Sequence, residues 1–516
     1  MTSHTLSLGE TTQFSPIFLD YIQNKAALQP FFSLYPSIES FEAQIQAKAN
    51  YFSLNNRERL YQTLTKQYQA IAQKPDLSIL QDANTFTVTT GHQLNIFTGP
   101  LYVIYKLVTT VNLAKALQAH YPQYKFVPVY WMASEDHDLA EINHFHLFGK
   151  KHMWETQQTG AVGRMNPQDM RTLFQTIPEK ISLFEEAYLN HDTLANATRF
   201  FANELFGNDG LVCIDADDIA LKSLFTHVMR DDLTNHTAYS LVKNASQQLE
   251  ALGYKTQVNA REINFFYLDG NIRERIVEEG KKYKVLNTNL TFSQAELLDL
   301  IENEPQKLSP NVILRPIYQE TVLPNLAYIG GPAEVAYWLQ LKSVFTHYQI
   351  PFPIVMPRNF ALIINKVSVK RIQKLNLTYQ DLFLEDTSLK NRFLEKNSDG
   401  FVLDEETRAL DEVFDTVLKK AIRLDKSLEG FVLAEKQKVL KVTENIEKRL
   451  KKAVENTQET EVNQVLGLKT KLFPGGGLQE RTDNYLNFAF NNPTFIQEVK
   501  SVFDPLNFQF YILTED

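Results

Sequence analysis

Thr85-Phe-Thr-Val-Thr-Thr90, with the residues that follow it, decides the fold expected for this chain. These six residues are rich in β-branched side chains, which favours a strand. Residues 91–100 are polar and predict a loop, and the apolar periodicity of residues 101–117 predicts a helix. Residues 126–133 then predict a second buried strand. Strand, helix and strand in this order form a βαβ unit, which is typical of a parallel sheet in an α/β protein.

Polar segments follow both predicted strands. Gly91 and His92 come directly after the first strand, and Ser134-Glu-Asp-His-Asp138 comes after the second. Ligands of open parallel sheets bind beyond the carboxyl ends of the strands. We therefore expect the two segments to point into one cavity.

Composition excludes several classes of protein. The chain has 516 residues, 44% hydrophobic residues and a net charge of −9, values typical of a globular protein of two to four domains. The acidic balance argues against nucleic acid as a partner. No apolar run reaches the ~18 residues of a membrane span, and no leader peptide is visible, so we expect a cytoplasmic enzyme without a membrane partner. The single cysteine, Cys213, excludes an internal disulfide, and we expect it in a buried strand at 211–215.

Two regions interrupt or extend the α/β core. Asp269-Gly270 between two β-rich runs predicts a hairpin, and hence an antiparallel insertion. From residue 404, apolar residues alternate spacings of four and three, which predicts two long helices in an antiparallel coiled coil. The last ~35 residues look helical, and we expect them to pack back on the core.

The loop after the first strand is the first candidate site. Gly91 would let the backbone approach a ligand, and the free N–H groups at the start of the next helix favour an anion. His92 could contact phosphate or stabilise a developing negative charge. The alternative is that His92 only satisfies the loop backbone.

The acidic segment after the second strand is the second candidate. A carboxylate there could orient His137 as a general base. The acids could also hold a substrate ammonium or a divalent metal, although the histidine spacing matches no standard zinc site. Alternatively, Glu135 and Asp136 are helix-capping acids.

Three further segments are weaker candidates. Gly330 and Gly331 precede a helix on which Glu334 and Tyr337 share a face, although Tyr337 fits a core position equally well. Arg315 and Arg358 each adjoin a proline and could bind a carboxylate or phosphate, or form structural ion pairs. The glycine-rich loop at residues 475–477 could hold a phosphate or could simply turn the chain.

With these residues in view, the chain resembles the bacillithiol-biosynthesis cysteine-adding enzymes, the BshC family of cysteine ligases. The segments that carry the resemblance are Thr90-Gly-His-Gln-Leu-Asn-Ile-Phe-Thr-Gly-Pro-Leu-Tyr102, Ser134-Glu-Asp-His-Asp-Leu-Ala-Glu-Ile-Asn143, Asn311-Val-Ile-Leu-Arg-Pro316, Leu323-Pro-Asn-Leu-Ala-Tyr-Ile-Gly-Gly-Pro-Ala-Glu334, Met356-Pro-Arg358 and Leu478-Gln-Glu-Arg481. The resemblance implies an α/β fold with a Rossmann-like parallel sheet, connective insertions, a helical coiled-coil domain and a homodimer. We place the core at residues 1–384 with insertions at about 150–205 and 255–310, the coiled coil at 385–472 and a C-terminal segment at 473–516.

The resemblance also implies an activity. Such enzymes act in the last step of bacillithiol biosynthesis, where an amide bond joins cysteine to glucosaminyl malate. The family core is in turn similar to class I aminoacyl-tRNA synthetases, whose His-rich signature binds ATP phosphates at the place of Gly91-His92-Gln93. A counterpart of their Lys-Met-Ser-Lys-Ser motif is absent from this sequence.

We therefore predict a carbon–nitrogen ligase that uses ATP or ADP. The predicted catalytic residues are His92, Glu135, His137 and Asp138. Those assigned to substrate or nucleotide binding are Gly91, Gln93, Asn95, Thr98, Arg315, Gly330, Gly331, Glu334, Tyr337, Arg358, Gly475, Gly476, Gly477 and Arg481. We assign no metal ligand and leave a metal requirement open. The alternatives are a nucleotidyltransferase with another acceptor, or a non-catalytic coiled-coil partner protein of the pathway.

Overall fold

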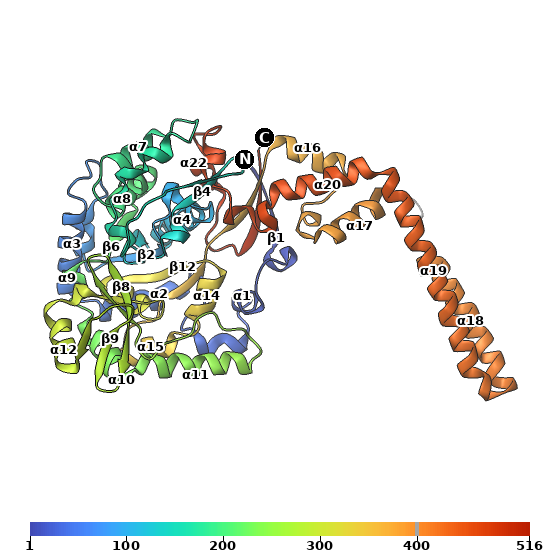
Figure 1. Cartoon of the computed structure of the whole chain (residues 1–516), viewed down its shortest axis with the longest axis horizontal. Coiled ribbons are helices and arrows are strands. Elements are labelled where there is room, and N and C mark those ends of the chain that lie inside the picture. The colour runs from blue at the N-terminus through green and yellow to red at the C-terminus, as the bar shows by residue number, and fades with distance from the viewer. Residues whose placement is uncertain (398–401, 516) are drawn as a thin grey trace.

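A computed structural model describes residues 1–397 and 402–515 of the chain. Its main body is built around a parallel sheet, and a long helical hairpin projects from one side of this body (Figure 1). The predicted fold class is therefore confirmed: an α/β core with an antiparallel insertion, followed by a coiled coil.

The central sheet has five parallel strands in the order β13-β12-β2-β3-β6. These strands are β2 (Thr85–His92), β3 (Lys125–Met132), β6 (Val212–Asp215), β12 (Asn325–Gly330) and β13 (Ile354–Pro357). All are parallel, so their carboxyl ends meet at one edge of the sheet. Helix α4 (Tyr102–His120) connects β2 to β3, as the sequence predicts.

Burial on both faces explains why these strands are so apolar. Parallel sheets are normally covered by helices on both sides, and β12 is buried along its whole length. The threonines of β2 are buried as well. The hydroxyl groups of Thr87 and Thr89 both hydrogen bond to the side chain of Asn325 on β12. Cys213 is buried in β6, as expected.

A separate antiparallel sheet forms the predicted insertion. Its strands follow the order β10-β9-β8-β7-β11, and the turn at Asp269-Gly270 joins β7 to β8 as predicted. The strands are β7 (Phe265–Asp269), β8 (Ile272–Glu279), β9 (Lys282–Val285), β10 (Thr291–Ser293) and β11 (Leu308–Pro310).

The C-terminal segment differs from the expectation of helices only. It contains short helices α21 (Leu486–Ala489) and α22 (Phe495–Val502), but it ends in strand β15 (Gln509–Thr514). This strand lies between β1 (Thr2–Ser7) and β14 (Phe360–Ile364) in a third sheet. Pairing with two distant strands, which no local pattern reveals, stabilises the extended conformation.

The projecting hairpin consists of α18 (Asp404–Leu424) and α19 (Glu429–Thr457), and α20 (Glu459–Leu472) leads back to the main body. The first two helices pack against each other, and Lys436 of α19 forms ion pairs of 2.8 Å with Asp411 and Asp415 of α18. The hairpin is thus the antiparallel coiled coil that the heptad spacing predicts.

Candidate functional site

The carboxyl ends of β2, β12 and β13 enclose a small cavity, here called the strand-end pocket. Its volume is about 280 Å³, and its lining residues are His92, Tyr102, Gly331, Pro332, Ala333, Glu334, Arg358 and Arg481. His92 ends β2, Gly331 directly follows β12 and Arg358 directly follows β13, as expected for ligand sites in open α/β sheets. The structure thus brings together in one cavity five of the residues that the sequence analysis assigns to the site: His92, Gly331, Glu334, Arg358 and Arg481.

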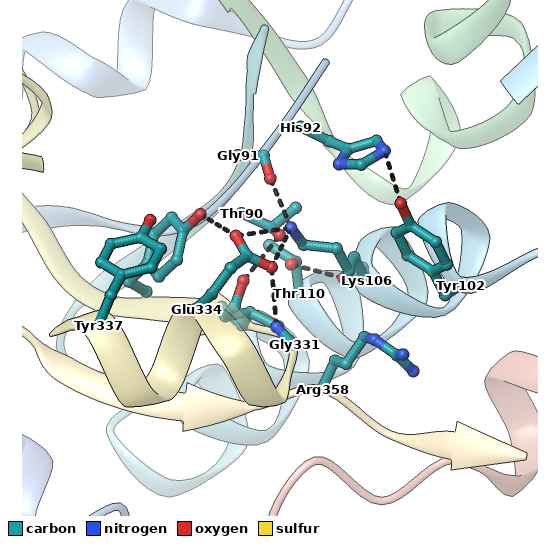
Figure 2. A network of polar contacts seen from close by, with 12 residues as sticks. Thr90, Gly91, His92, Tyr102, Lys106, Thr110, Gly331, Glu334, Tyr337 and Arg358 are labelled. Carbon is teal, nitrogen blue, oxygen red and sulfur yellow. Dashed lines mark hydrogen bonds and ion pairs between the residues drawn. The ribbon is translucent and has the colours of Figure 1, made fainter. Parts of the chain in front are cut away.

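An ion pair between buried Lys106 and partly buried Glu334 joins the strand ends beside the pocket (Figure 2). Lys106 of α4, only 1% exposed, donates to both carboxylate oxygens of Glu334 at 3.0 and 2.8 Å and to the carbonyl of Gly91 at 2.5 Å. Tyr328 donates to Glu334 Oε1 at 2.5 Å, and the Gly331 N–H donates to Oε2 at 2.8 Å. Glu334 therefore ties together the ends of β2 and β12, and its oxygens already have partners.

Burial alone would raise the pKa of Glu334, but the adjacent Lys106 charge and hydrogen bonds outweigh it and hold this pKa below its usual value. Burial likewise lowers the pKa of Lys106, an effect that the Glu334 charge opposes. Each charge thus stabilises the other, and the role of the pair in the site is to fix the strand ends.

His92 is the neutral member of the pocket. Burial, helped by the nearby positive charge of Lys106, lowers its pKa to about 3. Its Nε2 lies 3.5 Å from the hydroxyl of Tyr102. A neutral imidazole cannot supply a positive charge at physiological pH, but it can donate a hydrogen bond to an oxygen on which negative charge develops.

Arg358 and Arg481 give the pocket its positive charge. Arg358 is 3% exposed and forms a 2.5 Å ion pair with Glu480, while its Nη1 donates to the carbonyl of Asn359. Its Nε has no partner although it is buried. An unpaired buried N–H is costly, so this donor suits an anionic ligand.

A second polar cluster lies at the ends of β3 and β6. Lys222 is fully buried, forms an ion pair with Glu135, and lies 3.3 Å from Asp217, which Arg164 also contacts. Burial raises the pKa of Glu135, and the Lys222 charge opposes the shift. Asp138 caps the short helix α5 (Leu139–Ile142) by accepting from the Glu141 N–H. Both predicted catalytic acids thus have structural partners.

His137 belongs to the same edge but faces the insertion. Arg273 of β8 donates to His137 Nδ1 at 2.7 Å, and its guanidinium lies 4.1 Å from the ring centre of Phe266. Because Nδ1 accepts this bond, the neutral imidazole carries its proton on Nε2. In this arrangement His137 presents a hydrogen-bond donor, and its accepting nitrogen is occupied.

Gln93 connects the two clusters. Its side-chain nitrogen donates to Asp136 and to Glu141, both at 2.7 Å. The hydrogen bond from Gln93 and the charge of Arg273 lower the pKa of Asp136 against the opposing effect of burial. His92 and His137 therefore lie on adjoining parts of one sheet edge, but the prediction that both segments point into one cavity is wrong: His92 lines the strand-end pocket, whereas no residue of 134–138 does. Contacts with Arg273 and Lys222 hold His137 and Glu135 elsewhere.

The other residues predicted from the first loop and from segment 315–337 lie behind or beside the pocket. A side chain at Gly91 would lie 3.2 Å from the Tyr328 hydroxyl, and one at Gly330 would lie 3.0 Å from Glu334 Cβ, so close packing explains both glycines. Arg315 contacts Gln319 and Tyr337 and does not line the pocket. Asn95 and Thr98 are buried in the loop that precedes α4, where Asn95 donates to the Glu141 carbonyl.

The glycine-rich loop lines another, larger cavity of about 890 Å³, here called the loop pocket. Gly475 belongs to its lining together with Asn365, Thr470 and Lys471, and Gly476 and Gly477 continue the same loop. The turn η12 (Gln479–Arg481) separates the two cavities, since Gln479 lines the loop pocket and Arg481 lines the strand-end pocket.

Sequence reasoning missed Lys106, Tyr102, Arg273 and Glu480. Lys106 had a recognisable signal, because it is a charged residue within a continuous apolar stretch of the predicted helix. Tyr102 and Glu480 lie within the motif segments that carry the family resemblance, and Tyr102 is only ten positions from its partner His92, so both could have been found there. Arg273 had no signal, since its partner His137 lies 136 positions away in the sequence.

Two searches of the described residues gave negative results. No group of three or more His, Cys, Asp or Glu side chains within residues 1–397 and 402–515 is arranged to hold a metal ion. None of the helices in these ranges is both long and apolar enough to cross a membrane.

Comparison with protein families then decides the relationship. Residues 1–359 match the model of the N-terminal Rossmann-like domain of bacillithiol biosynthesis BshC, and residues 361–515 match that of its C-terminal coiled-coil domain. The chain belongs to the BshC family. The predicted resemblance is thus confirmed, and both halves of the family architecture are present.

Curated relatives in this family are similar over their full length. The protein named "Putative cysteine ligase BshC" from Flavobacterium johnsoniae is 42% identical, with 100% of each chain covered. Its namesake from Cytophaga hutchinsonii is 40% identical, with 98% of this chain and 97% of the relative covered. These names support the prediction of an enzyme of the ligase class.

A solved structure titled "putative arginyl t-RNA synthetase", from Campylobacter jejuni, covers 84% of this chain and 99% of its own at 12% identity, with a TM-score of 0.22. A likeness this weak carries no argument about fold or activity.

Proposed function

We propose that this chain is a carbon–nitrogen ligase that joins the carboxyl group of cysteine to the amino group of glucosaminyl malate, in the last step of bacillithiol biosynthesis. One observation supports this most: the strand-end pocket combines a neutral imidazole with Arg358 and Arg481, two arginines suited to a substrate with carboxylates. Membership of a family whose members carry a cysteine ligase name agrees with it.

Making an amide from a free carboxylate is uphill, so the cysteine carboxyl must first be activated. ATP or ADP would supply the leaving group. The loop pocket has donors suited to a polyphosphate, including Lys471 and the backbone of Gly475. These residues would hold the nucleotide, so activation of a carboxyl group bound in the strand-end pocket requires the phosphate to reach past the turn η12, which separates the two cavities. The glycine-rich loop keeps the role predicted from the sequence.

In the bond-forming step, the amine nitrogen attacks the activated acyl carbon, the bond to the leaving group breaks, and the amine loses a proton. His92 would donate a hydrogen bond to the acyl oxygen as its negative charge develops. Arg358 and Arg481 would hold the malate carboxylates. Glu135 is paired with Lys222, and Glu334 is paired with Lys106. These two acids would therefore hold the surrounding elements in place and would not take part in the reaction.

His137 remains the proposed proton acceptor, with two conditions set by its position and its contacts. It does not line the strand-end pocket, so the amine must reach beyond that pocket along the sheet edge. Its Nδ1 accepts from Arg273, so this nitrogen becomes available only when Arg273 moves away. Because Arg273 lies on the insertion, this step would depend on a small movement of β8 relative to the sheet edge.

We also propose that the chain forms a homodimer through the coiled coil. Several large apolar side chains on the two helices remain exposed, namely Val413, Val417, Leu424, Phe431, Leu433, Val442 and Ile446. Exposed apolar surface of this extent is typical of an interface. Light scattering should show a dimer for the wild type and a monomer for the double variant Val417→Glu/Phe431→Glu. The control variant Lys438→Glu changes a charge on the same helix as Phe431 and should remain a dimer. A monomeric wild type would contradict the proposal.

The catalytic proposal is tested with purified protein, cysteine, glucosaminyl malate and ATP, with the thiol product followed by mass. We expect product with the wild type and a loss of about 100-fold in rate for His92→Ala, as for removal of one oxyanion donor. His191→Ala is a matched control, because His191 bonds to the Ala187 carbonyl away from both pockets. Absence of product with the wild type, or full activity of His92→Ala, would contradict the assignment.

A further inference from the structure

The turn η12 (Gln479–Arg481) lies between the two pockets. Its middle residue, Glu480, has no role in the proposed reaction. Glu480 is 0% exposed. The residues on either side of it line different cavities: Gln479 lines the loop pocket and Arg481 lines the strand-end pocket. A buried carboxylate between two cavities calls for an explanation, because burying a charge is costly unless it is paired.

The contacts of Glu480 fix it firmly to strand β14. Its Oε1 accepts from Arg358 Nη2 at 2.5 Å, and its Oε2 lies 3.3 Å from the N–H of Ala361, which donates to it. The neighbouring Gln479 side chain donates to the carbonyl of Ile363 and accepts from its N–H, at 3.1 and 2.9 Å. The turn therefore behaves as an additional hydrogen-bonded edge of the strand.

These contacts leave Arg358 one orientation. Glu480 holds Nη2, the Asn359 carbonyl holds Nη1, and the rings of Phe360 and Tyr102 lie 4.4 and 5.4 Å from the guanidinium carbon. The guanidinium is planar and rigid, so fixing both ends also fixes Nε. That atom is buried without a partner and lies 3.8 Å from where a Cβ of Gly331, a pocket-lining residue, would stand. In Figure 2, Arg358 points away from Glu334 and toward the side of Tyr102.

We propose that Glu480 is a positioning residue of the strand-end pocket: it holds Arg358 so that Nε presents its N–H to a carboxylate of the substrate. The inference rests on the proposed function in one respect, that this pocket takes a dicarboxylate such as malate. Glu480 and Arg481 belong to the part of the chain that matches the coiled-coil domain model. This C-terminal part would then complete a substrate pocket of the Rossmann-like domain.

The test measures malate binding to the full chain by calorimetry, together with the KM values for glucosaminyl malate and for cysteine. Glu480→Gln keeps the size of the side chain but removes its charge. We expect malate affinity to fall by about 10-fold or more and the KM for glucosaminyl malate to rise by a similar factor, while the KM for cysteine stays unchanged. A purely structural defect would alter both KM values.

Two further variants keep the test decisive. Glu455→Gln is the matched control, because Glu455 pairs with Lys390 at 3.0 Å in the same C-terminal part of the chain but away from both pockets. If Glu480→Gln does not fold, Glu480→Asp keeps the charge and withdraws the carboxylate from Arg358, and it should also weaken malate binding.

Unchanged malate affinity in a folded Glu480→Gln or Glu480→Asp protein would overturn the inference while leaving the proposed function intact. A wild type that binds no malate would refute the carboxylate site itself, and the positioning role would fall with it.

Discussion

Removal of the buried Lys106 charge gives the sharpest test of the strand-end geometry. Lys106→Met keeps the aliphatic stem and leaves Glu334 without its cationic partner. Breaking a buried ion pair from one side costs about 3–5 kcal/mol. Glu334 is only partly buried and keeps its bonds from Tyr328 and Gly331, so we expect the lower end, about 3 kcal/mol of unfolding free energy.

The loss of unfolding free energy in Lys106→Met should depend on pH, and its direction follows from the pKa of Glu334. In the wild type the pKa of Glu334 lies below its usual value of 4.5, so its stabilising contribution is present above that value and disappears as pH falls through the folded pKa. Without Lys106, burial dominates and raises the pKa of Glu334. The penalty of the variant is then largest at neutral pH and shrinks as acidification protonates the carboxyl group.

Urea unfolding followed by tryptophan fluorescence is a suitable assay. The three tryptophans of the chain, Trp131, Trp154 and Trp338, are all buried in the main body, so they report on it rather than on the coiled coil. Lys115→Met is a matched control on the same helix, since its exposed pair with Asp209 should contribute about 0–1 kcal/mol. Lys106→Met/Glu334→Gln should recover part of the loss. Equal, pH-independent losses for Lys106→Met and Lys115→Met would refute the reasoning.

Other predictions follow from single contacts. Because the pKa of His92 is about 3, its imidazole should stay neutral throughout about pH 5–8; an NMR titration midpoint in that range, assigned by its loss in His92→Gln, would contradict this. Burial raises the pKa of the Cys213 thiol to about 11, so a thiol reagent should modify the chain only after denaturation, and rapid labelling of the native protein would be inconsistent with the fold. Arg273→Gln removes the donor to His137 Nδ1, so the ¹⁵N signals of this ring should shift from one neutral tautomer toward a mixture, whereas unchanged signals would show that Arg273 does not set the tautomer.

Much of the fold could be predicted because its signals are local. The β-branched run at 85–90, the apolar periodicity after residue 100 and the Asp269-Gly270 turn each specify an element through neighbouring residues alone. Heptad spacing specifies the coiled coil in the same way. The terminal strand β15 was one exception, because a short apolar run acquires its extended form only by pairing with β1 and β14, which were not predicted either.

The sequence by itself determined the family, the βαβ core and which polar segments follow its strands, since each depends on residue order and local pattern. Only the tertiary structure decided which of those polar groups remain open to a ligand. Glu334 meets a lysine 228 positions earlier, His137 meets an arginine 136 positions later, and Arg358 meets Glu480 122 positions away. Such partners decide whether a charged side chain is occupied or available, and chain folding alone brings them together.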